Sequence, residues 1–212
     1  IRQLFLQSGY MEVETPTVEF YDVFSGCQNL IPQEDMFKFT DPQGRILVLK
    51  PDMTIPVARV AATKLKENLW PVKVFYISNT FSYNEMGGGK QKEYTQAGVE
   101  VLGISSPEAD AELISLAIQA LKRAGIDEFQ IDIGQVDFFR GLMEQSGLSE
   151  SETEEVRELI DKKDFVGVEQ LVNRHAIADE LKELILNLPR YFGSTDVIDE
   201  LARKNVSGKA LK

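Results

Sequence analysis

EYTQAGVEVLG, residues 93–103, is the stretch of sequence that decides the fold. Alternate side chains of a β-strand point to the same face of a sheet. One face of this segment is therefore apolar, and it carries Thr95, Ala97, Val99 and Val101. The other face carries Tyr94, Gln96, Gly98 and Glu100. The alternation predicts a strand that packs its first face against helices and presents a row of polar side chains on its second.

This polar row would lie in the middle of a sheet if the strongly β-prone segment 72–78 (VKVFYIS) pairs with the strand. Buried amides and carboxylates need hydrogen-bond partners. At ~3.3 Å per residue, Gln96 and Glu100 are about 13 Å apart, and Gly98 between them leaves a shallow floor. A small ligand with an ammonium group would suit such a floor. The alternative is a solvated face, as in many antiparallel sheets, with Gly98 marking a bulge or close packing.

The segments around this strand predict a mixed α+β domain. Two apolar runs on either side of residues 41–44 (DPQG) predict a β-hairpin, because Pro and Gly favour a tight loop. Residues 54–69 carry an apolar stripe with the period of a helix. Alternating apolar residues predict a last strand over 129–136. We place this domain at residues 1–137.

A long amphipathic helix is expected over residues 105–125, and from residue 138 onward the pattern is helical. Serine or threonine three residues before glutamate is the signature of a capped helix start. Two such capping boxes are predicted, at Ser105 with Glu108 and at Ser149 with Glu152. The region 138–212 is therefore interpreted as a helical insertion or appended module.

Three consecutive glycines, residues 87–89, interrupt the segment FSYNEMGGGKQKE. They are typical of a flexible hairpin tip. A phosphate-binding loop is the alternative, but the spacing GxxxxGK[ST] and a following helix are missing.

Composition narrows the classes of function. The net charge of −11 disfavours nucleic-acid binding, which depends on basic patches. A single cysteine, Cys27, and a single histidine, His175, exclude an internal disulfide and a multi-histidine metal site. We expect no metal and no cofactor. No apolar run is long enough to span a membrane and no signal peptide is evident, so a cytoplasmic location is expected.

Four segments in order resemble the class II aminoacyl-tRNA synthetases, specifically the histidyl branch. GYMEVETPTVEF (9–20) is similar to the end of motif 1, with Pro16 at the motif's proline. LKPDMTIPVAR (49–59) is similar to the LRPEGT segment, and SNTFSYNEMGGGKQKEYTQAGVEVLG (78–103) to motif 2. IDIGQVDFFRGLM (131–143), before the helical region, also fits. The resemblance implies a class II synthetase-like α+β fold: an antiparallel sheet flanked by helices, with a helical insertion.

The resemblance also assigns an amino-acid pocket. Asp52 and Thr54 occupy the positions of the EGT residues, which bind the amino acid in that family. Gln96 and Glu100 occupy the positions that grip the substrate amino group.

The nucleotide site departs from the family. Glu85 and Tyr94 fall where synthetases contact adenine, but Ser82 stands where they have the motif 2 arginine. That arginine holds the ATP α-phosphate, and phosphoryl chemistry depends on such cations. We expect a degenerate nucleotide site and no catalytic residue.

The Asp-Met-Thr version of the EGT segment and the phrase NTFSYNE…TQAGVE resemble the family of ATP phosphoribosyltransferase regulatory subunits. That resemblance implies a non-catalytic subunit acting in the first step of histidine biosynthesis. Its partner would be the short-form catalytic subunit in a hetero-octamer, with histidine as a feedback effector and no tRNA. Whether histidine binds in the pocket or at the partner interface stays open. The alternatives are a catalytic core fragment of a histidyl-tRNA synthetase and another synthetase paralogue.

Self-association as a dimer is expected through motif 1. An apolar cluster near a strand end carries this prediction, and it consists of Val18, Phe20, Tyr21 and Phe24. The alternative is that these side chains fill the core of a monomer.

Overall fold

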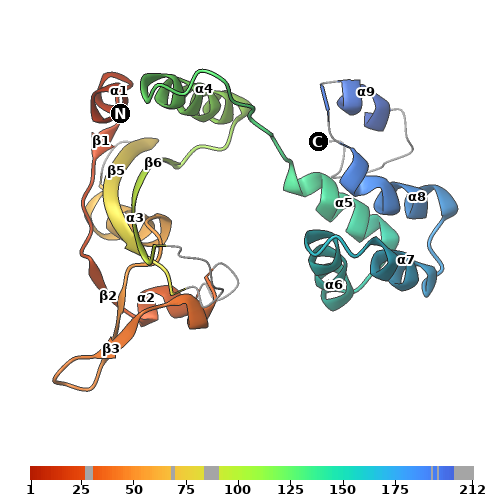
Figure 1. Cartoon of the computed structure of the whole chain (residues 1–212), viewed down its shortest axis with the longest axis horizontal. Helices are drawn as coiled ribbons and strands as arrows, with labels where there is room; N and C mark the ends of the chain where they lie inside the picture. The colour runs from red at the N-terminus through yellow and green to blue at the C-terminus, as the bar shows by residue number, and fades with distance from the viewer. Residues whose placement is uncertain (27–30, 68–69, 84–90, 192, 195, 203–212) are drawn as a thin grey trace. The chain divides into compact units, whose positions relative to one another are not determined.

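The computed structural model describes residues 1–212 except 27–30, 68–69, 84–90, 192, 195 and 203–212. The chain divides into two compact units, Ile1–Phe129 and Gln130–Lys212 (Figure 1). The division falls eight residues before the boundary expected at 137/138. The difference arises because we expected residues 129–136 to form the last strand of the first domain, whereas almost all of this segment belongs to the second unit.

The main sheet of the first unit has the strand order β1-β5-β6. Its strands are β1 (Met11–Glu12), β5 (Val72–Phe81) and β6 (Glu93–Leu102). The predicted pairing of β5 with β6 is confirmed and is antiparallel, whereas β1 joins β5 in parallel.

Helices cover the sheet as the alternation of β6 predicts. α1 (Arg2–Gln7) and α4 (Pro107–Arg123) pack against one face, where Val99 and Val101 meet Phe75 and Leu116 (Figure 1). The other face is covered at one end by α3 (Thr54–Lys64), and its core consists of Met53, Val57, Val72, Val74 and Tyr76. The polar row of β6 therefore shares its face with α3.

A second, small sheet has the order β2-β4-β3, all antiparallel. Its strands are β2 (Val18–Phe20), β3 (Lys38–Thr40) and β4 (Ile46–Leu49), and α2 (Asp22–Ser25) and a 3₁₀ turn (Gln33–Asp35) adjoin it. The predicted hairpin is confirmed. Asp41 Oδ1 closes its turn by accepting from the backbone N–H groups of Gln43 and Arg45, each at 2.9 Å.

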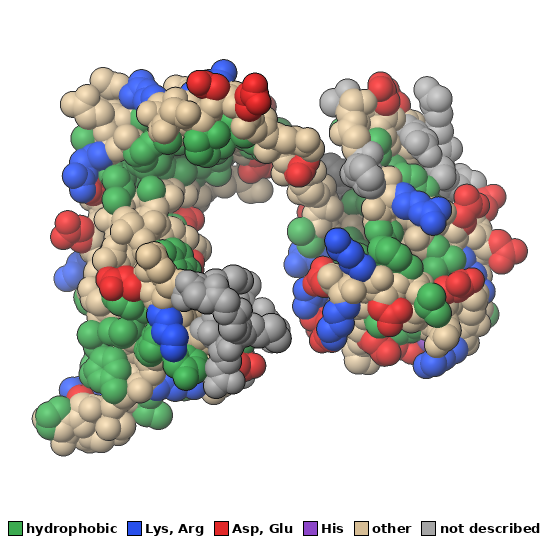
Figure 2. Space-filling model, in the orientation of Figure 1, with side chains coloured by type: hydrophobic (Ala, Val, Ile, Leu, Met, Phe, Trp, Pro, Cys, Tyr) green, Lys and Arg blue, Asp and Glu red, His purple; other side chains and the backbone are tan. Residues whose placement is uncertain are grey.

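One face of the small sheet is apolar and partly exposed. Val18 and Phe20 pair with Leu49 and Leu47, and Phe39 pairs with Leu47, so the five side chains share a face. Val18 is 40% exposed and Phe20 43%. Figure 2 shows hydrophobic side chains gathered around this sheet. Of the predicted apolar cluster, Phe24 instead lies fully buried in the monomer core with Met36 and Val48.

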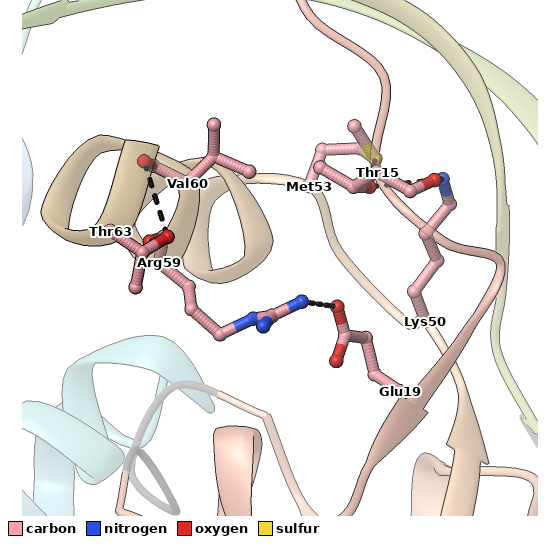
Figure 3. Close-up of polar contacts among 7 residues, drawn as sticks. All are labelled: Thr15, Glu19, Lys50, Met53, Arg59, Val60 and Thr63. Carbon is pink, nitrogen blue, oxygen red and sulfur yellow. Dashed lines mark hydrogen bonds and ion pairs between the residues drawn. The ribbon is translucent and has the colours of Figure 1, made fainter. Parts of the chain in front are cut away.

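Two buried polar residues join the small sheet to the rest of the unit (Figure 3). Glu19 on β2 is buried and ion-paired with Arg59 of α3.

Lys50, just after β4, donates its backbone N–H to Thr17 O, and its carbonyl oxygen accepts from Phe81 N at the end of β5, both at 3.0 Å. Its ammonium group donates to Thr15 O and Thr15 Oγ1 on one side and to Ser78 Oγ of β5 on the other. Lys50 is therefore the point where both sheets meet.

The start of α4 differs by one residue from the prediction. Ser106, not Ser105, is the N-cap, and its Oγ accepts from Ala109 N at 3.3 Å. Pro107 occupies the first helical position, for which its fixed φ is suited, so the cap falls on the residue before it.

The last strand predicted over 129–136 is wrong. Residues 129–135 form no strand, and Val136 begins a helix. Ile133 is 73% exposed. A strand exists through hydrogen bonds to a neighbour, and none of the described strands lies alongside this segment. The alternation of apolar and polar residues does not reveal whether a neighbouring strand is present.

The second unit is helical, as predicted. Its helices are α5 (Val136–Ser146), α6 (Glu150–Asp161), α7 (Phe165–Asn173), α8 (Asp179–Asn187) and α9 (Asp196–Ala202), with a 3₁₀ turn at Leu188–Arg190. They enclose a core that includes Leu142, Val156, Val172 and Ile185. The capping box of Ser149 and Glu152 is confirmed at the start of α6. Within the described ranges, no helix has the length and apolar character needed to cross a membrane.

Candidate functional site

The candidate site lies on the polar face of the β5–β6 ribbon. In this antiparallel register Glu100, Gly98, Gln96 and Tyr94 stand opposite Val74, Tyr76, Ser78 and Thr80. Side chains opposite one another share a face, so the four predicted positions of β6 form one row with their partners on β5. The sequence thus placed the row on the correct face of the strand.

The start of α3 brings Asp52 and Thr54 to this row. Asp52 Oδ1 accepts from the backbone N–H of Thr54 at 2.7 Å and of Ile55 at 3.4 Å, which holds the first turn of the helix. Thr54 Oγ1 then donates to Glu100 Oε1 at 2.9 Å. Asp52 and Thr54 also line a cavity of about 440 Å³ with Ile31, Pro51 and Ile55. Three of the four predicted amino-acid ligands are therefore neighbours.

Glu100 is the electrostatic centre of this group. Burial raises the pKa of its carboxyl group, the hydrogen bond from Thr54 lowers it, and the charge of Asp52 raises it again. Two carboxylates thus lie close together, and no cation among the described residues contacts Glu100. A ligand cation at this point would relieve both burial and repulsion.

Tyr76 is a site residue that the sequence argument missed. We expected a shallow floor at Gly98, with a bulge or close packing as the alternative, and close packing is what is found. The phenol of Tyr76, which is only 4% exposed, fills this space. A Cβ atom at Gly98 would lie 2.4 Å from Cζ and Oη of Tyr76, so the ring needs the glycine. The strand register could have indicated this contact, because Tyr76 stands directly opposite Gly98. Aromatic rings often cover a glycine on the next strand.

Tyr76, like Glu100, has a raised pKa because it is buried close to carboxylates. Burial, followed by the charges of Glu100 and Asp52, raises the pKa of the Tyr76 hydroxyl to about 12, although a hydrogen bond with Thr54 lowers it. The floor of the site is therefore a neutral phenol between acidic groups, and it favours a positively charged ligand above it.

Gln96 completes the row with an unsatisfied atom. Its Oε1 is buried and has no hydrogen-bond partner among the described residues. Buried amide oxygens are normally paired, because leaving one unpaired costs about 1–3 kcal/mol. This oxygen is consequently available to accept from a ligand N–H.

The predicted nucleotide positions lie further along the same ribbon. Ser82 continues the strand pairing by donating its backbone N–H to Lys92 O at 3.0 Å, and Tyr94 is 45% exposed. Nearby, Phe37 and Tyr83 form an edge-to-face pair, with Lys92 Nζ 4.0 Å from the Tyr83 ring centre. Glu85 and the glycines 87–89 lie outside the described residues.

Comparison with known proteins supplies the family. The model of the family described as histidyl-tRNA synthetase matches residues 1–212. The ATP phosphoribosyltransferase regulatory subunits of Acetivibrio thermocellus and Ruminiclostridium cellulolyticum are 64% and 53% identical to the whole chain. In both cases the chain spans about half (51%) of the relative's length.

Solved structures agree on the fold. An ATP phosphoribosyltransferase regulatory subunit/histidyl-tRNA synthetase from Bacillus halodurans has a TM-score of 0.88 at 35% identity, over 99% of this chain and 54% of that one. The histidyl-tRNA synthetase of Nostoc has a TM-score of 0.73 at 22% identity, over 95% and 46% of the two chains, and shows the fold alone. The fold is that of the class II synthetases, and the chain belongs to the histidyl-tRNA synthetase family.

Proposed function

We propose that this chain belongs to a regulatory subunit of ATP phosphoribosyltransferase, in the cytoplasm, and that it catalyses no reaction of its own. The observation that carries the proposal is the contrast between two parts of one ribbon. An acidic pocket suited to an amino acid is retained at Glu100, whereas the neutral Ser82 stands where the resemblance places an arginine. The names of the most similar relatives support the same assignment.

The retained pocket is proposed to bind histidine. Glu100, Asp52 and Thr54 offer negative charge and a hydroxyl to the cationic groups of the ligand, and Gln96 offers its unpaired oxygen. Histidine carries an ammonium group and an imidazole, and both can donate to these acceptors.

The nucleotide site is proposed to be inactive. A serine hydroxyl carries no charge to hold a phosphate, and losing one such donor lowers a rate by roughly 10²–10³. Tyr94 is exposed and could still contact a base, but contact without a cationic clamp gives binding rather than adenylate formation.

The proposed partner is the short-form catalytic subunit, and histidine is proposed to inhibit the complex. Because such regulation is a coupling free energy, it works in both directions. If histidine weakens substrate binding by some factor, substrate must weaken histidine binding by the same factor.

Two measurements test the assignment. Adding the purified protein to the short catalytic subunit should switch on phosphoribosyl transfer to ATP, and histidine should then inhibit it. Histidine-dependent ATP–pyrophosphate exchange should stay at background. Exchange at the pace of an ordinary synthetase would establish the alternative, a histidyl-tRNA synthetase fragment.

Dimerisation is proposed to use the exposed apolar face of the small sheet, formed by Val18, Phe20, Phe39, Leu47 and Leu49. Burying Phe20 in a two-fold contact would remove apolar surface from water on both chains. Phe20→Asp should lower the mass in light scattering to that of a monomer. A monomeric mass of the wild-type protein at every concentration would refute the dimer.

A further inference from the structure

Lys50 is a buried cation whose bonding partners are all neutral. It is 1% exposed, and its Nζ donates to Thr15 O at 3.1 Å, Thr15 Oγ1 at 3.2 Å and Ser78 Oγ at 2.7 Å. Across the part of the chain that the structure describes, no carboxylate forms an ion pair with it. Burial lowers the pKa of Lys50, and the more distant charges of Glu14 and Glu19 raise it. Holding an ammonium group this way is costly, because none of its hydrogen-bond partners carries a compensating negative charge.

Ser78 links this cation to the polar row of the β5–β6 ribbon. It is half-buried, stands directly opposite Gln96 and shares its face with Tyr76. Its oxygen accepts from Lys50 Nζ, so its hydroxyl hydrogen is left to donate. None of the described residues accepts that hydrogen. Since a hydroxyl that accepts from a cation becomes a stronger donor, Ser78 presents positive character to the pocket.

The polar row therefore has two unlike ends. Glu100, Asp52 and Thr54 form the acidic end, and Ser78 with Lys50 behind it forms an end that donates. A free amino acid carries both charges, so it needs a donor for its carboxylate beside the acceptors for its N–H groups, and among these acceptors Gln96 stands directly opposite Ser78. In this chain Ser82 supplies no charge for that purpose.

We propose that Ser78 binds the carboxylate of the amino acid and that Lys50 is the positioning residue that orients and polarises the Ser78 hydroxyl. The inference rests on the proposed binding of histidine in this pocket. All three ammonium hydrogens of Lys50 are used inside the protein, so Lys50 makes no direct hydrogen bond to the ligand and reaches it through the Ser78 hydroxyl. The pair can thus hold a carboxylate without clamping a triphosphate, which fits a protein that binds the amino acid and does not activate it.

Calorimetry with two ligands tests this. L-histidine and histamine share the imidazole and the amine, and histamine lacks the carboxylate. Wild-type protein should prefer L-histidine. Ser78→Ala and Lys50→Met should each weaken L-histidine binding by about ten- to a hundredfold, the worth of a hydrogen bond to a charged group, and leave histamine binding unchanged. Methionine keeps much of the length of the lysine chain without its charge.

Lys73→Met is the matched control. Lys73 lies on the same strand, on the opposite face, where it pairs with Glu112 at 2.7 Å. Its loss should leave the preference for L-histidine intact.

The outcomes separate the two claims. Equal weakening of both ligands by Ser78→Ala, or an unchanged preference, would overturn the role of Ser78 while histidine binding itself stands. If Lys50→Met does not fold, Ser78→Ala alone decides, because it removes one oxygen atom. If the wild-type protein binds neither ligand, the proposed pocket fails and this inference falls with it.

Discussion

In the helical unit, Arg157 of α6 and Lys162, the residue that follows this helix, form ion pairs with side chains three or four residues away. In the α+β unit, the hydrogen bonds that the side chains of Lys50, Arg59 and Thr54 donate join residues between 28 and 46 positions apart. Exposed local pairs contribute roughly 0.2–1 kcal/mol each and fix little beyond one helix. The long-range contacts fix the geometry between elements. We infer that these long-range contacts hold the elements around the candidate site, whereas the local pairs of Arg157 and Lys162 support one helix.

The largest effects should come from the two cores. Phe75 and Leu142 are both fully buried, one under the main sheet's helices and one in the helical unit. Phe75→Ala and Leu142→Ala should each lower the free energy of unfolding by roughly 2–5 kcal/mol. In calorimetry at a temperature where both variants are folded, only Phe75→Ala should weaken L-histidine binding. Weakened binding in Leu142→Ala would show that the pocket depends on the helical unit as well.

Glu100→Gln should separate binding from stability. It should weaken L-histidine binding by roughly 10- to 100-fold, because a charge-assisted hydrogen bond is lost. It should not lower stability, since burial disfavours the charge that the substitution removes. Glu154→Gln, on the exposed face of α6, is the control and should change neither the affinity nor the fold.

The same variant predicts a pH dependence. The pKa of Glu100 is raised in the folded protein, so the folded state binds the proton more tightly than the unfolded state does. Its contribution to stability is therefore greatest below the ordinary glutamate pKa and is lost as pH rises through the raised pKa. Denaturant unfolding across this range should show that wild type loses stability relative to Glu100→Gln as pH increases. The opposite slope would contradict the assigned cause.

Gly98→Ala should have a smaller effect on stability. The new methyl group would lie 2.4 Å from the Tyr76 ring, which must shift, at a cost of roughly 1–3 kcal/mol. Gly26→Ala is the control, because a Cβ there meets nothing within 4 Å. If both variants unfold at the same denaturant concentration, Tyr76 is not confined by Gly98.

Ser149→Ala should have the smallest effect. It removes the side chain that accepts from Glu152 N in the capping box of α6, which should cost about 1 kcal/mol. The affinity for histidine should stay at the wild-type value. A changed affinity would contradict the view that binding does not depend on the helical unit.

The sequence predicted the elements whose signals are local. The alternation of β6, the hairpin around Asp41 and the capping box at Ser149 all depend on residues a few positions apart, and all three are confirmed. The helix start at Ser106 was missed by one residue, because the capping-box spacing to Glu108 favoured Ser105, whereas Pro107 at the first helical position places the cap on Ser106.

Features that depend on distant segments were not predictable in this way. The pattern of residues 129–136 is that of a strand, yet pairing requires a neighbour that no local pattern specifies. Asp52 and Thr54 were placed by resemblance, and their contact with Glu100 required the fold. The burial of Lys50 was not predicted at all, because it depends on the contact between the two sheets, which no local pattern specifies.

The parallel pairing of β1 with β5 has a consequence for folding order. It joins Met11 to Val74, whereas β3–β4 and β5–β6 pair through much shorter connections. Closing a long loop is entropically unfavourable, so the hairpins should form early and the N-terminal strand should dock last. In native-state hydrogen exchange, the Val13 amide, which donates to Phe75 O, should then lose its protection before the β5–β6 ladder opens.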